Sequence, residues 1–341
     1  MVPELFRFKK IRTFNYPILG VNSSAADQTV FLDLKDFVQK ETIARGFIRI
    51  VGNIIIAGAG PGVATGRDTE QLISNVINTT APSLGVLHLN NVNGRDFQDM
   101  GIFDKGFSFR AAAIADAAGT TAVDFTVPFT LKMPGSINPI EWALPMAAFE
   151  SSILQITVSG RNALFTGGTN TWDMTGLSIQ VFVDLDDGVA GDFHVVENLV
   201  KTYPILATQT DFPLPGLDAG YIYTHFLFKE EASNVKVNNI LNSLTIQSAG
   251  RIWLPQGDAN KLTIQRWNRE THVNSQAENM TGLTFVPALR DGMYKRGIDS
   301  LDSKLDIKCD VTVQTGAVLK LYLRRIIPLA VKAVGVRPTG T

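Results

Sequence analysis

The sequence has few of the residues from which metal sites and disulfide-stapled folds are built. Its single cysteine, Cys309, excludes an internal disulfide framework, and its four histidines show none of the spacings of a zinc-binding motif. Only 18% of the residues are charged and the net charge is -1, which argues against nucleic-acid binding through a general basic face. We therefore predict no cofactor and no direct sequence-specific contact with nucleic acid.

Long apolar runs are also missing. No stretch approaches the roughly 18 apolar residues that a membrane-spanning helix needs, and the N-terminus lacks the apolar core of a signal peptide. We expect a chain that is soluble or assembles from a soluble form.

Catalytic and nucleotide-binding motifs are absent as well. The stretch Gly58-Ala-Gly60-Pro-Gly62 follows an apolar strand, but position 63 is valine where a dinucleotide fingerprint needs glycine, and no Gly-Lys-Ser/Thr follows. A surface loop is the better interpretation. No Gly-x-Ser-x-Gly elbow is present, and Cys309 alternates inward on a predicted strand, which makes it a poor catalytic thiol. Carboxylate pairs from distant strands are left open, but we predict that the chain is not an enzyme.

Strict alternation of apolar and polar residues is abundant and predicts strands with one buried face. It runs through residues 123–131, 177–185 and 305–313. Pro128 predicts that the first of these strands lies at a sheet edge or carries a bulge, because proline has no N–H to donate. Helical signals are short and confined to loops, at 68–76, at 140–149 after Asn138-Pro139, and at 259–269.

One pattern occurs twice, once in each half of the chain. The residues from Gln71 to Val76 and from Asn239 to Leu244 share an amide, two aliphatics, two small polar residues and an aliphatic. Repetition at so large a separation predicts a duplicated β-sandwich.

Acidic residues and glycine collect at 184–192, where the alternation stops, and we place the domain boundary there. The predicted fold class is all-β, with two tandem eight-stranded antiparallel jelly-roll sandwiches and short loop helices. The predicted parts are an N-terminal arm at 1–27, a first jelly roll at 28–187, a linker at 188–201, a second jelly roll at 202–330 and a C-terminal tail at 331–341.

The same acidic stretch is a candidate cation site, because calcium prefers several oxygen ligands from a short loop. Its spacing does not fit the 12-residue calcium loop with a closing glutamate, so a solvated acidic linker is favoured over a metal site. The residues concerned are Asp184, Asp186, Asp187 and Asp192.

The predicted arm interleaves cations with large apolar side chains. Such a segment can lie on an anionic lipid surface, with aromatic rings at the depth of the headgroups and cations beside the phosphates. The alternative is an arm that packs on a neighbouring subunit. The candidate membrane-facing residues are Phe6, Arg7, Phe8, Lys9, Lys10 and Arg12.

An ordered set of short patterns resembles the double jelly-roll major capsid proteins of tectiviruses, corticoviruses and adenovirus-like viruses. The resemblance extends over most of the chain and includes the pattern from Gln71 to Val76. The other patterns are Thr29-Val-Phe-Leu-Asp-Leu, Ala44-Arg-Gly-Phe-Ile-Arg-Ile, Val123-Asp-Phe-Thr-Val-Pro-Phe, Ile140-Glu-Trp-Ala-Leu-Pro, Ser152-Ile-Leu-Gln-Ile-Thr-Val and Phe285-Val-Pro-Ala-Leu-Arg-Asp-Gly-Met-Tyr.

This resemblance implies a virion protein that trimerises into pseudo-hexagonal capsomers of an icosahedral shell, over an internal membrane in many such viruses, bacteriophages among them. It implies vertex (penton) and minor capsid proteins as further partners, and assembly in the host cytoplasm. The alternative is a carbohydrate-binding or host-attachment β-sandwich, in which Trp172, Trp253 and Trp267 would stack on sugars. An enzyme built on a β-sandwich comes third.

Overall fold

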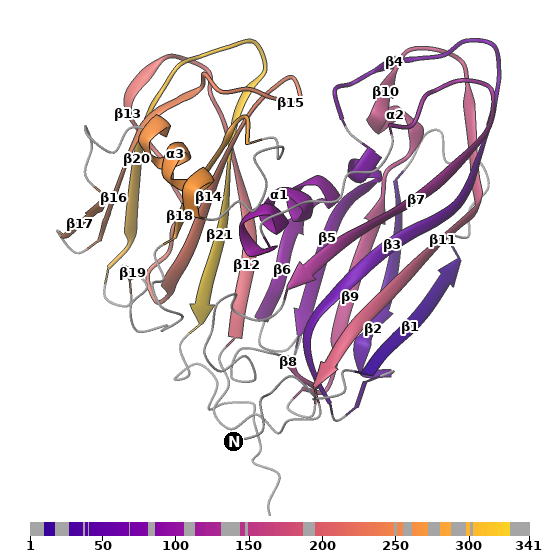
Figure 1. Ribbon diagram of the computed structural model, residues 1–341, viewed down its shortest axis with the longest axis horizontal. Coiled ribbons are helices and arrows are strands. Elements are labelled where there is room, and N and C mark those ends of the chain that lie inside the picture. The colour runs from indigo at the N-terminus through magenta and orange to yellow at the C-terminus, as the bar shows by residue number, and fades with distance from the viewer. Residues whose placement is uncertain are drawn as a thin grey trace, which may run out of the picture. The chain divides into compact units, whose positions relative to one another are not determined.

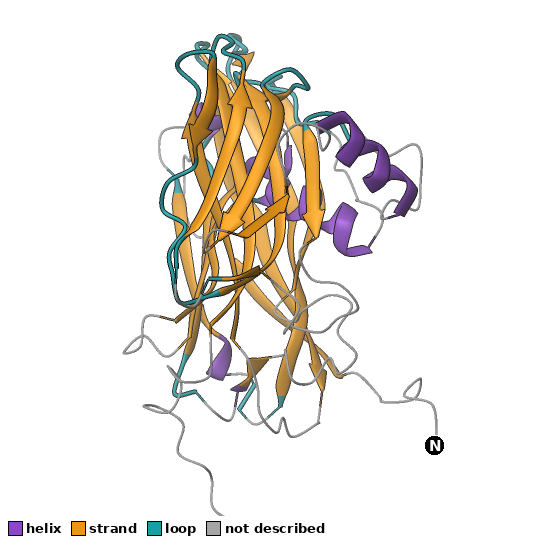
Figure 2. Ribbon diagram, turned by 90° about the vertical axis from the view of Figure 1, so that its left-hand side faces the viewer, coloured by secondary structure: helices purple, strands orange, loops and turns teal. Residues whose placement is uncertain are grey.

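The computed structural model consists mainly of strands, with few helices (Figure 2). No helix among the described residues is long and apolar enough to cross a membrane. The described residues are 10–17, 27–36, 38–39, 41–67, 69–80, 86–105, 113–130, 144–146, 149–186, 195–248, 251–254, 261–271, 280–287, 298–300 and 303–327.

The chain divides into two compact units, which we name the first roll and the second roll. The first roll takes its described residues from 1–98 and 109–195, and the second from 99–108 and 196–331. The chain thus enters the second roll at Asp99, within helix α1 (Gly94–Lys105), and again at Val196, one residue into strand β12 (Val195–Pro204).

The first roll is a sandwich of two antiparallel sheets (Figure 1). In one sheet the strand order is β1 (Lys10–Pro17), β11 (Thr171–Asp186), β3 (Thr42–Ala57) and β7 (Gly119–Thr130). In the other the order is β2 (Gln28–Asp33), β9 (Ser152–Val158), β5 (Ile73–Thr80) and β6 (Val86–Val92). Shorter elements are β8 (Leu144–Pro145), which pairs with β3, the ribbon of β4 (Val63–Ala64) and β10 (Phe165–Thr166), helix α2 (Arg161–Leu164), and the 3-10 turns Leu34–Asp36 and Thr69–Leu72.

The second roll has two sheets of the same kind. In one, β12 is followed by β21 (Ala317–Ile327), β14 (Ile222–Ala232) and β18 (Leu283–Pro287). In the other, the order is β13 (Gln209–Pro213), β20 (Leu305–Val311), β16 (Leu241–Ser248) and β17 (Arg251–Leu254). The short strands β15 (Val235–Lys236) and β19 (Ile298–Asp299) also pair with β14, and helix α3 (Lys261–Thr271) follows β17.

Both rolls have jelly-roll topology. We number the eight long strands of each roll from one to eight in chain order. In both rolls, the neighbouring strands of one sheet are then one, eight, three and six, and those of the other sheet are two, seven, four and five. The same permutation in both units is the double Greek key of a jelly roll. The predicted fold class of two tandem eight-stranded antiparallel jelly rolls is therefore confirmed.

The repeat found in the sequence lies at the start of the fourth strand of each roll. Ile73 begins β5 and Leu241 begins β16, and these are the third residues of the two copies. The residue before each strand accepts an equivalent hydrogen bond. Ser159 N donates to Leu72 O, and Thr312 N donates to Ile240 O, both at 2.8 Å. Each donor directly follows the seventh strand of its roll, so the repeat marks the same structural junction twice.

Within the strands, the alternating patterns place their apolar residues in the cores, as predicted, but Val313 lies beyond the end of β20 and is 40% exposed. Val123, Phe125, Val127 and Phe129 on β7 are at most 5% exposed, and Phe125 lies opposite Ile50 on β3. In the second roll, Leu305, Ile307, Cys309 and Val311 are buried in the same way. Pro128 lies on β7, at the end of its sheet's strand order, so the predicted edge position is confirmed.

Of the three helical predictions, one is confirmed, one holds only for its first turn and one fails in the described residues. Helix α3 confirms the stretch at 259–269, but Leu144 and Pro145 of the stretch 140–149 pair with β3 as a strand. After position 68, which lies outside the described residues, a 3-10 turn ends at Leu72, and Val76 is already in β5. In both places sheet pairing supplies backbone hydrogen bonds that a short isolated helix cannot match.

The ends of the predicted domains contain strands. β1 lies within the predicted arm and pairs with β11, from Lys10 opposite Leu185 to Pro17 opposite Ser178. β12 begins at Val195, within the predicted linker. The domain limits given above remain predictions, and residues 331–341 lie outside the described part of the chain.

Candidate functional site

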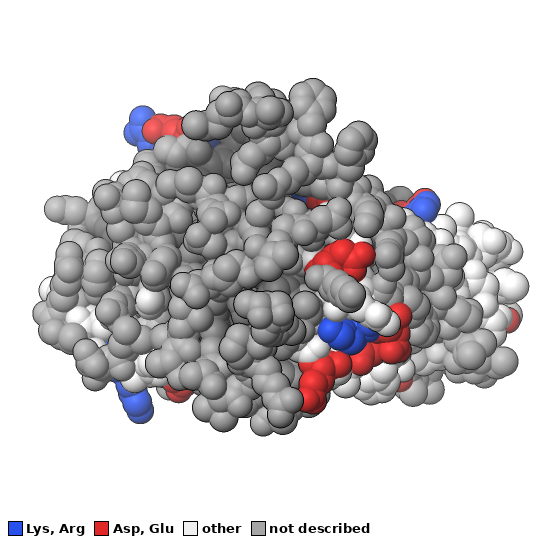
Figure 3. Space-filling view, turned by 90° about the horizontal axis from the view of Figure 1, so that it is seen from below, with Lys and Arg blue, Asp and Glu red and all other residues white. Residues whose placement is uncertain are grey.

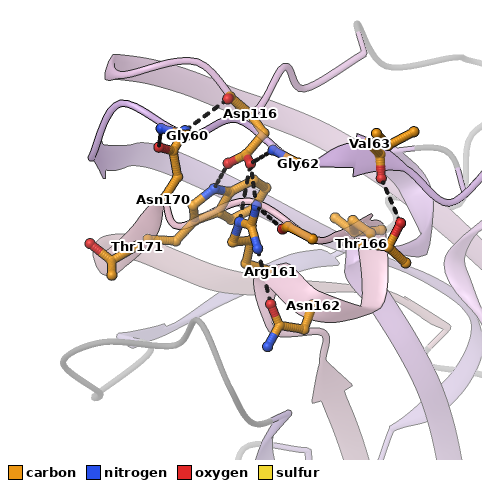
Figure 4. A network of polar contacts seen from close by, with 12 residues as sticks. Gly60, Gly62, Val63, Asp116, Arg161, Asn162, Thr166, Asn170 and Thr171 are labelled. Carbon is orange, nitrogen blue, oxygen red and sulfur yellow. Dashed lines mark hydrogen bonds and ion pairs between the residues drawn. The ribbon is translucent and has the colours of Figure 1, made fainter.

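The first roll contains a buried ion pair that ties together the loops at one of its ends. Asp116 lies in the segment before β7, and Arg161 begins α2; their side chains are 1% and 4% exposed. Arg161 donates to Asp116 Oδ2 from Nη2 at 2.5 Å and from Nε at 3.1 Å. The guanidinium also donates to Gly167 O at 2.8 Å, which fixes the turn after β10 (Figure 4).

Two more donors complete the shell of Asp116. Gly62 N donates to Oδ2 at 2.6 Å, and Trp172 Nε1 donates to Oδ1 at 2.8 Å. The side-chain amide of Asn170 donates to Asp116 O at 2.9 Å, and its Oδ1 accepts from Gly60 N at 3.0 Å. Four separate stretches of chain, around residues 60, 116, 161 and 171, are thereby held on one carboxylate (Figure 4).

Glycine is required where the loops approach each other. Gly168 has φ +74, and a Cβ there would lie 2.5 Å from Gly60 O and 2.6 Å from Gly62 N. Residues 58–63 are exposed or half-buried, so the predicted surface loop is confirmed. Its amides at Gly60 and Gly62 already donate to Asn170 and Asp116, so they are not available to a phosphate.

The Asp116 carboxyl titrates abnormally. Burial alone would raise its pKa, but hydrogen bonds from Arg161, Gly62 and Trp172 outweigh that effect and lower the pKa from 3.8 to about 2. Because the folded-state pKa lies below the unfolded value, ionised Asp116 stabilises the fold above about pH 4, and this contribution is lost as the pH falls toward 2.

We therefore expect the first roll to lose stability between pH 4 and pH 2. The measurement is the urea unfolding midpoint at several pH values in this window. An Asp116→Asn variant, less stable overall, is expected to show a shallower loss because its amide does not titrate. Equal slopes for the two proteins would contradict the assignment of acid sensitivity to Asp116.

The second roll contains a larger buried network of charges, on the outer side of strands β14 and β21. Asp99 of α1 contacts two ammonium groups, with Lys229 Nζ at 2.8 Å from Oδ2 and Lys236 Nζ at 3.1 Å from Oδ1. Glu231 contacts Lys229 at 2.9 Å and Lys320 at 2.8 Å. Lys229 and Asp99 are fully buried. Burial opposes ionisation of Glu231, but Lys229 and Lys320 lower its pKa.

A separate buried glutamate connects helix α3 to the repeated junction. Glu230 Oε2 accepts from Ile240 N at 2.7 Å and Leu241 N at 2.8 Å, and Lys261 Nζ of α3 donates to Oε1 at 3.1 Å. Burial raises the pKa of Glu230 despite these donors. One side chain therefore caps the start of β16 and anchors the helix.

Apolar contacts hold the outer side of the same sheet beside the charged network. Ile102 and Phe103 of α1 pack with Phe285 and Tyr322, and the rings of Phe103 and Phe285 are stacked with centroids 4.6 Å apart. A cavity lined by Phe103, His225 and Phe285 has a volume of only about 20 Å³. That is room for a single water molecule and not for an organic ligand.

The described residues contain no arrangement suited to metal binding or to thiol chemistry. No group of three histidine, cysteine, aspartate or glutamate side chains among them is placed to hold a metal ion. Cys309 is buried in the core of the second roll, and burial raises the pKa of its thiol. His225 stacks on Phe285 at 5.7 Å between centroids.

The structure contradicts the predicted roles of Asp184 and Trp172. Asp184 lies on β11, is 6% exposed and pairs with Arg45 at 2.7 Å, so for this residue both the calcium loop and the solvated linker are wrong. Asp186 is the last residue of β11, and Asp187 and Asp192 lie outside the described residues. Trp172 is fully buried on Asp116 and cannot stack on a sugar. The side chains of Trp253 and Trp267 are outside the described set.

The candidate arm residues are divided by the limit of the described chain. Lys10 and Arg12 lie on β1, opposite Leu185 and Val183 of β11. The other four, Phe6, Arg7, Phe8 and Lys9, lie outside the described residues. On the face shown in Figure 3, described basic side chains lie beside acidic ones, and the described part of that face has no continuous basic patch.

Comparisons with known proteins give a match in structure alone. No family model matches the sequence, and no curated protein matches it. The structure is similar to the major capsid protein of the Sulfolobus turreted icosahedral virus, with a TM-score of 0.67 at 11% identity, over 96% of this chain and 100% of that one. It is also similar to the major capsid protein of bacteriophage PM2, with a TM-score of 0.57 at 13% identity, over 97% of this chain and 100% of that one.

A third similar structure is the capsid of the virus PBCV-1, with a TM-score of 0.57 at 11% identity, over 94% of this chain and 96% of that one. Because the identities are so low, these structural similarities show a shared fold alone. That fold is the pair of jelly rolls described above. The resemblance read from the sequence patterns is thus confirmed at the level of the fold.

Proposed function

We propose that the chain is the major capsid protein of a tailless icosahedral virus. The observation that carries this proposal is the match over nearly the whole of both chains to two major capsid proteins, each with two rolls in one polypeptide. Two rolls of identical topology supply two similar building blocks per chain, so three chains supply six. A trimer of this kind has a pseudo-hexagonal outline and can tile an icosahedral shell.

The buried networks suit such a building block. The Asp116–Arg161 pair and the Asp99 cluster hold loops and helices of each roll in one geometry. Contacts between many identical copies require surfaces that do not fluctuate, because ordering a mobile loop costs free energy at every contact. The proposed role is assembly, with neighbouring capsomers and with vertex and minor capsid proteins, and it includes no catalytic step. In this proposal the protein is located in the virion, and the capsid is assembled in the host cytoplasm.

The test is the mass of the purified protein in solution. We expect sedimentation to give three times the chain mass of 37.2 kDa at micromolar concentration. Few charged residues and many apolar strands favour a trimer with large protein interfaces. A particle of one chain mass that does not grow with concentration would contradict the proposal.

We also propose that the arm at 1–27 contacts an internal membrane through Phe6, Phe8 and the cations Arg7, Lys9, Lys10 and Arg12. Each cation near an anionic surface contributes about 1 kcal/mol, so four give a reversible attachment that many copies in a shell would multiply. Replacing the four cations by glutamate is expected to abolish flotation with anionic liposomes at low salt. Equal flotation of the altered and unaltered proteins would contradict this membrane contact.

A further inference from the structure

The two rolls differ in charge on the outer face of one pair of equivalent sheets. Strand four pairs with strand seven in both rolls, and the register is the same: Ile77 lies opposite Gln155 in the first roll, and Thr245 lies opposite Lys308 in the second. The pairs on either side also correspond. They are Asn75 with Thr157 and Thr79 with Ile153 in the first roll, and Ser243 with Asp310 and Gln247 with Asp306 in the second.

In the second roll this outer face is charged and partly exposed to solvent. Strand seven presents Asp306, Lys308 and Asp310, and the two carboxylates accept hydrogen bonds from their neighbours. Gln247 Nε2 donates to Asp306, and Ser243 Oγ donates to Asp310 at 2.6 Å. Such a face gains nothing from being covered, because desolvating the carboxylates costs free energy.

In the first roll the described outward residues of β2, β9 and β5 carry a single charge, that of Asp33, at one end of the face. The other outward residues on these strands are at least partly exposed, and we name this set the uncharged face: Thr29, Phe31, Asn75, Ile77, Thr79, Ile153, Gln155 and Thr157. Asp33, the one charged residue in these three strands, lies opposite Ile153 at the end of this face, where its Oδ1 accepts from Lys35 N and Ser152 N at 2.9 Å. Phe31 is 62% exposed and shares a row with Gln155 and Ile77.

A large exposed aromatic residue among neutral polar neighbours has the composition of an interface centre. Interface cores are depleted of charge and enriched in aromatic residues, and their strongest contacts are ringed by energetically neutral ones that exclude water. Three strands about 4.8 Å apart and about 7 residues long give a face of roughly 15 by 23 Å. That size fits the central part of an interface burying about 800 Å² per partner.

The polar half of the uncharged face identifies the kind of partner. Threonine, asparagine and glutamine side chains need hydrogen-bond partners when covered, and hydrocarbon offers none. Nucleic acid is also a poor occupant, because its phosphates require cations that this face lacks. We infer that the uncharged face packs against a second copy of this chain, between neighbouring subunits of the capsomer. This inference rests on the proposed capsid function.

The test compares two exposed apolar residues on edge strands of equivalent sheets. Phe31→Glu places a charge on the uncharged face, and Ile252→Glu places one on β17 of the second roll, where Ile252 is 57% exposed opposite Gln247. We expect Phe31→Glu to weaken trimer association at least tenfold in sedimentation equilibrium. Ile252→Glu is expected to leave association unchanged, because its face already carries charges.

The outcomes separate the inference from the function on which it rests. If the unaltered protein forms trimers and Phe31→Glu forms them equally well, the inference is wrong and the capsid proposal stands. If the unaltered protein stays a single chain at all concentrations, both are wrong. Circular dichroism of the variants shows whether a loss of assembly reflects unfolding.

A second variant tests the contact without adding charge. Cys309 is 1% exposed, so Phe31→Cys provides a single accessible thiol for a maleimide photo-crosslinker. We expect illumination of the labelled trimer to join two chains through position 31. An intact trimer without any crosslink between chains would overturn the inference even if Phe31→Glu failed to fold.

Discussion

Replacing Asp116 by alanine is expected to destabilise the first roll by about 3 to 5 kcal/mol, the usual cost of leaving one partner of a buried ion pair uncompensated. Arg161 would keep its positive charge at 4% exposure with no carboxylate beside it. Trp172 Nε1 and Gly62 N would also lose their acceptor, and each buried donor without a partner adds to the cost. Urea unfolding at fixed protein concentration measures the effect.

The matched control is Asp124→Ala in the same roll. Asp124 pairs with Arg49 at 2.6 Å, nearly the separation of the Asp116–Arg161 pair, but the two side chains are 56% and 35% exposed. An exposed pair contributes little because water solvates both charges when the pair is broken. Similar losses for the two variants would mean that burial does not set the value of the Asp116 pair.

Replacing Asp99 by asparagine is the second change with a large expected effect, of at least about 3 kcal/mol on the second roll. Among the described residues three lysines contact two carboxylates there, and Asp99→Asn removes the negative charge beside Lys229 and Lys236. Lys229 is fully buried and Lys236 is 9% exposed, so neither ammonium can regain water without moving. The free energy of unfolding of the second roll measures the loss.

Glu270→Gln provides the comparison in the same roll. Glu270 pairs with Arg266 at 3.2 Å along α3, and both side chains are mostly exposed. This substitution makes the same chemical change from carboxylate to amide at a solvated site, and we expect little change in stability. If Asp99→Asn were as mild as Glu270→Gln, the cluster would not hold α1 in place.

Much of this fold was predictable from the sequence because its strands follow simple physical rules. Alternation revealed β7, β11 and β20, since one face of each packs in a core and the other does not. The repeated pattern is recognisable because the residues before β5 and β16 make the same hydrogen bond at the same junction. Each roll keeps this junction for the same structural reason.

Other elements were not predicted correctly, although the sequence holds a local signal for one of them. Helix α1 begins with a reciprocal cap, in which Asp96 N donates to Asn93 Oδ1 at 2.9 Å and Asn93 N to Asp96 Oδ2 at 3.4 Å, and this pattern was available in the sequence. The run from Tyr203 to Phe212 has strand character throughout. The structure divides it into β12 and β13, with the break after Pro204, which cannot continue a hydrogen-bonded ladder.

The buried networks could not have been assembled from the sequence alone. Asp116 and Arg161 are far apart in the chain, as are Asp99 and Lys229, so only the fold brings the members of each pair together. Asp116 stands alone among alanines and other small residues, and this isolation was the one available sign of a buried carboxylate. The prediction that Trp172 lies on a binding surface is wrong because Trp172 is opposite Ile56, a buried residue of β3, and therefore on the core side of β11.

Electron microscopy of the purified protein tests the central claim most directly. Class averages of single particles viewed along their symmetry axis are expected to show three chains in a pseudo-hexagonal outline, with six similar densities for the six jelly rolls. Particles containing one chain, or dimers without that outline under conditions where the protein is folded, would contradict the account.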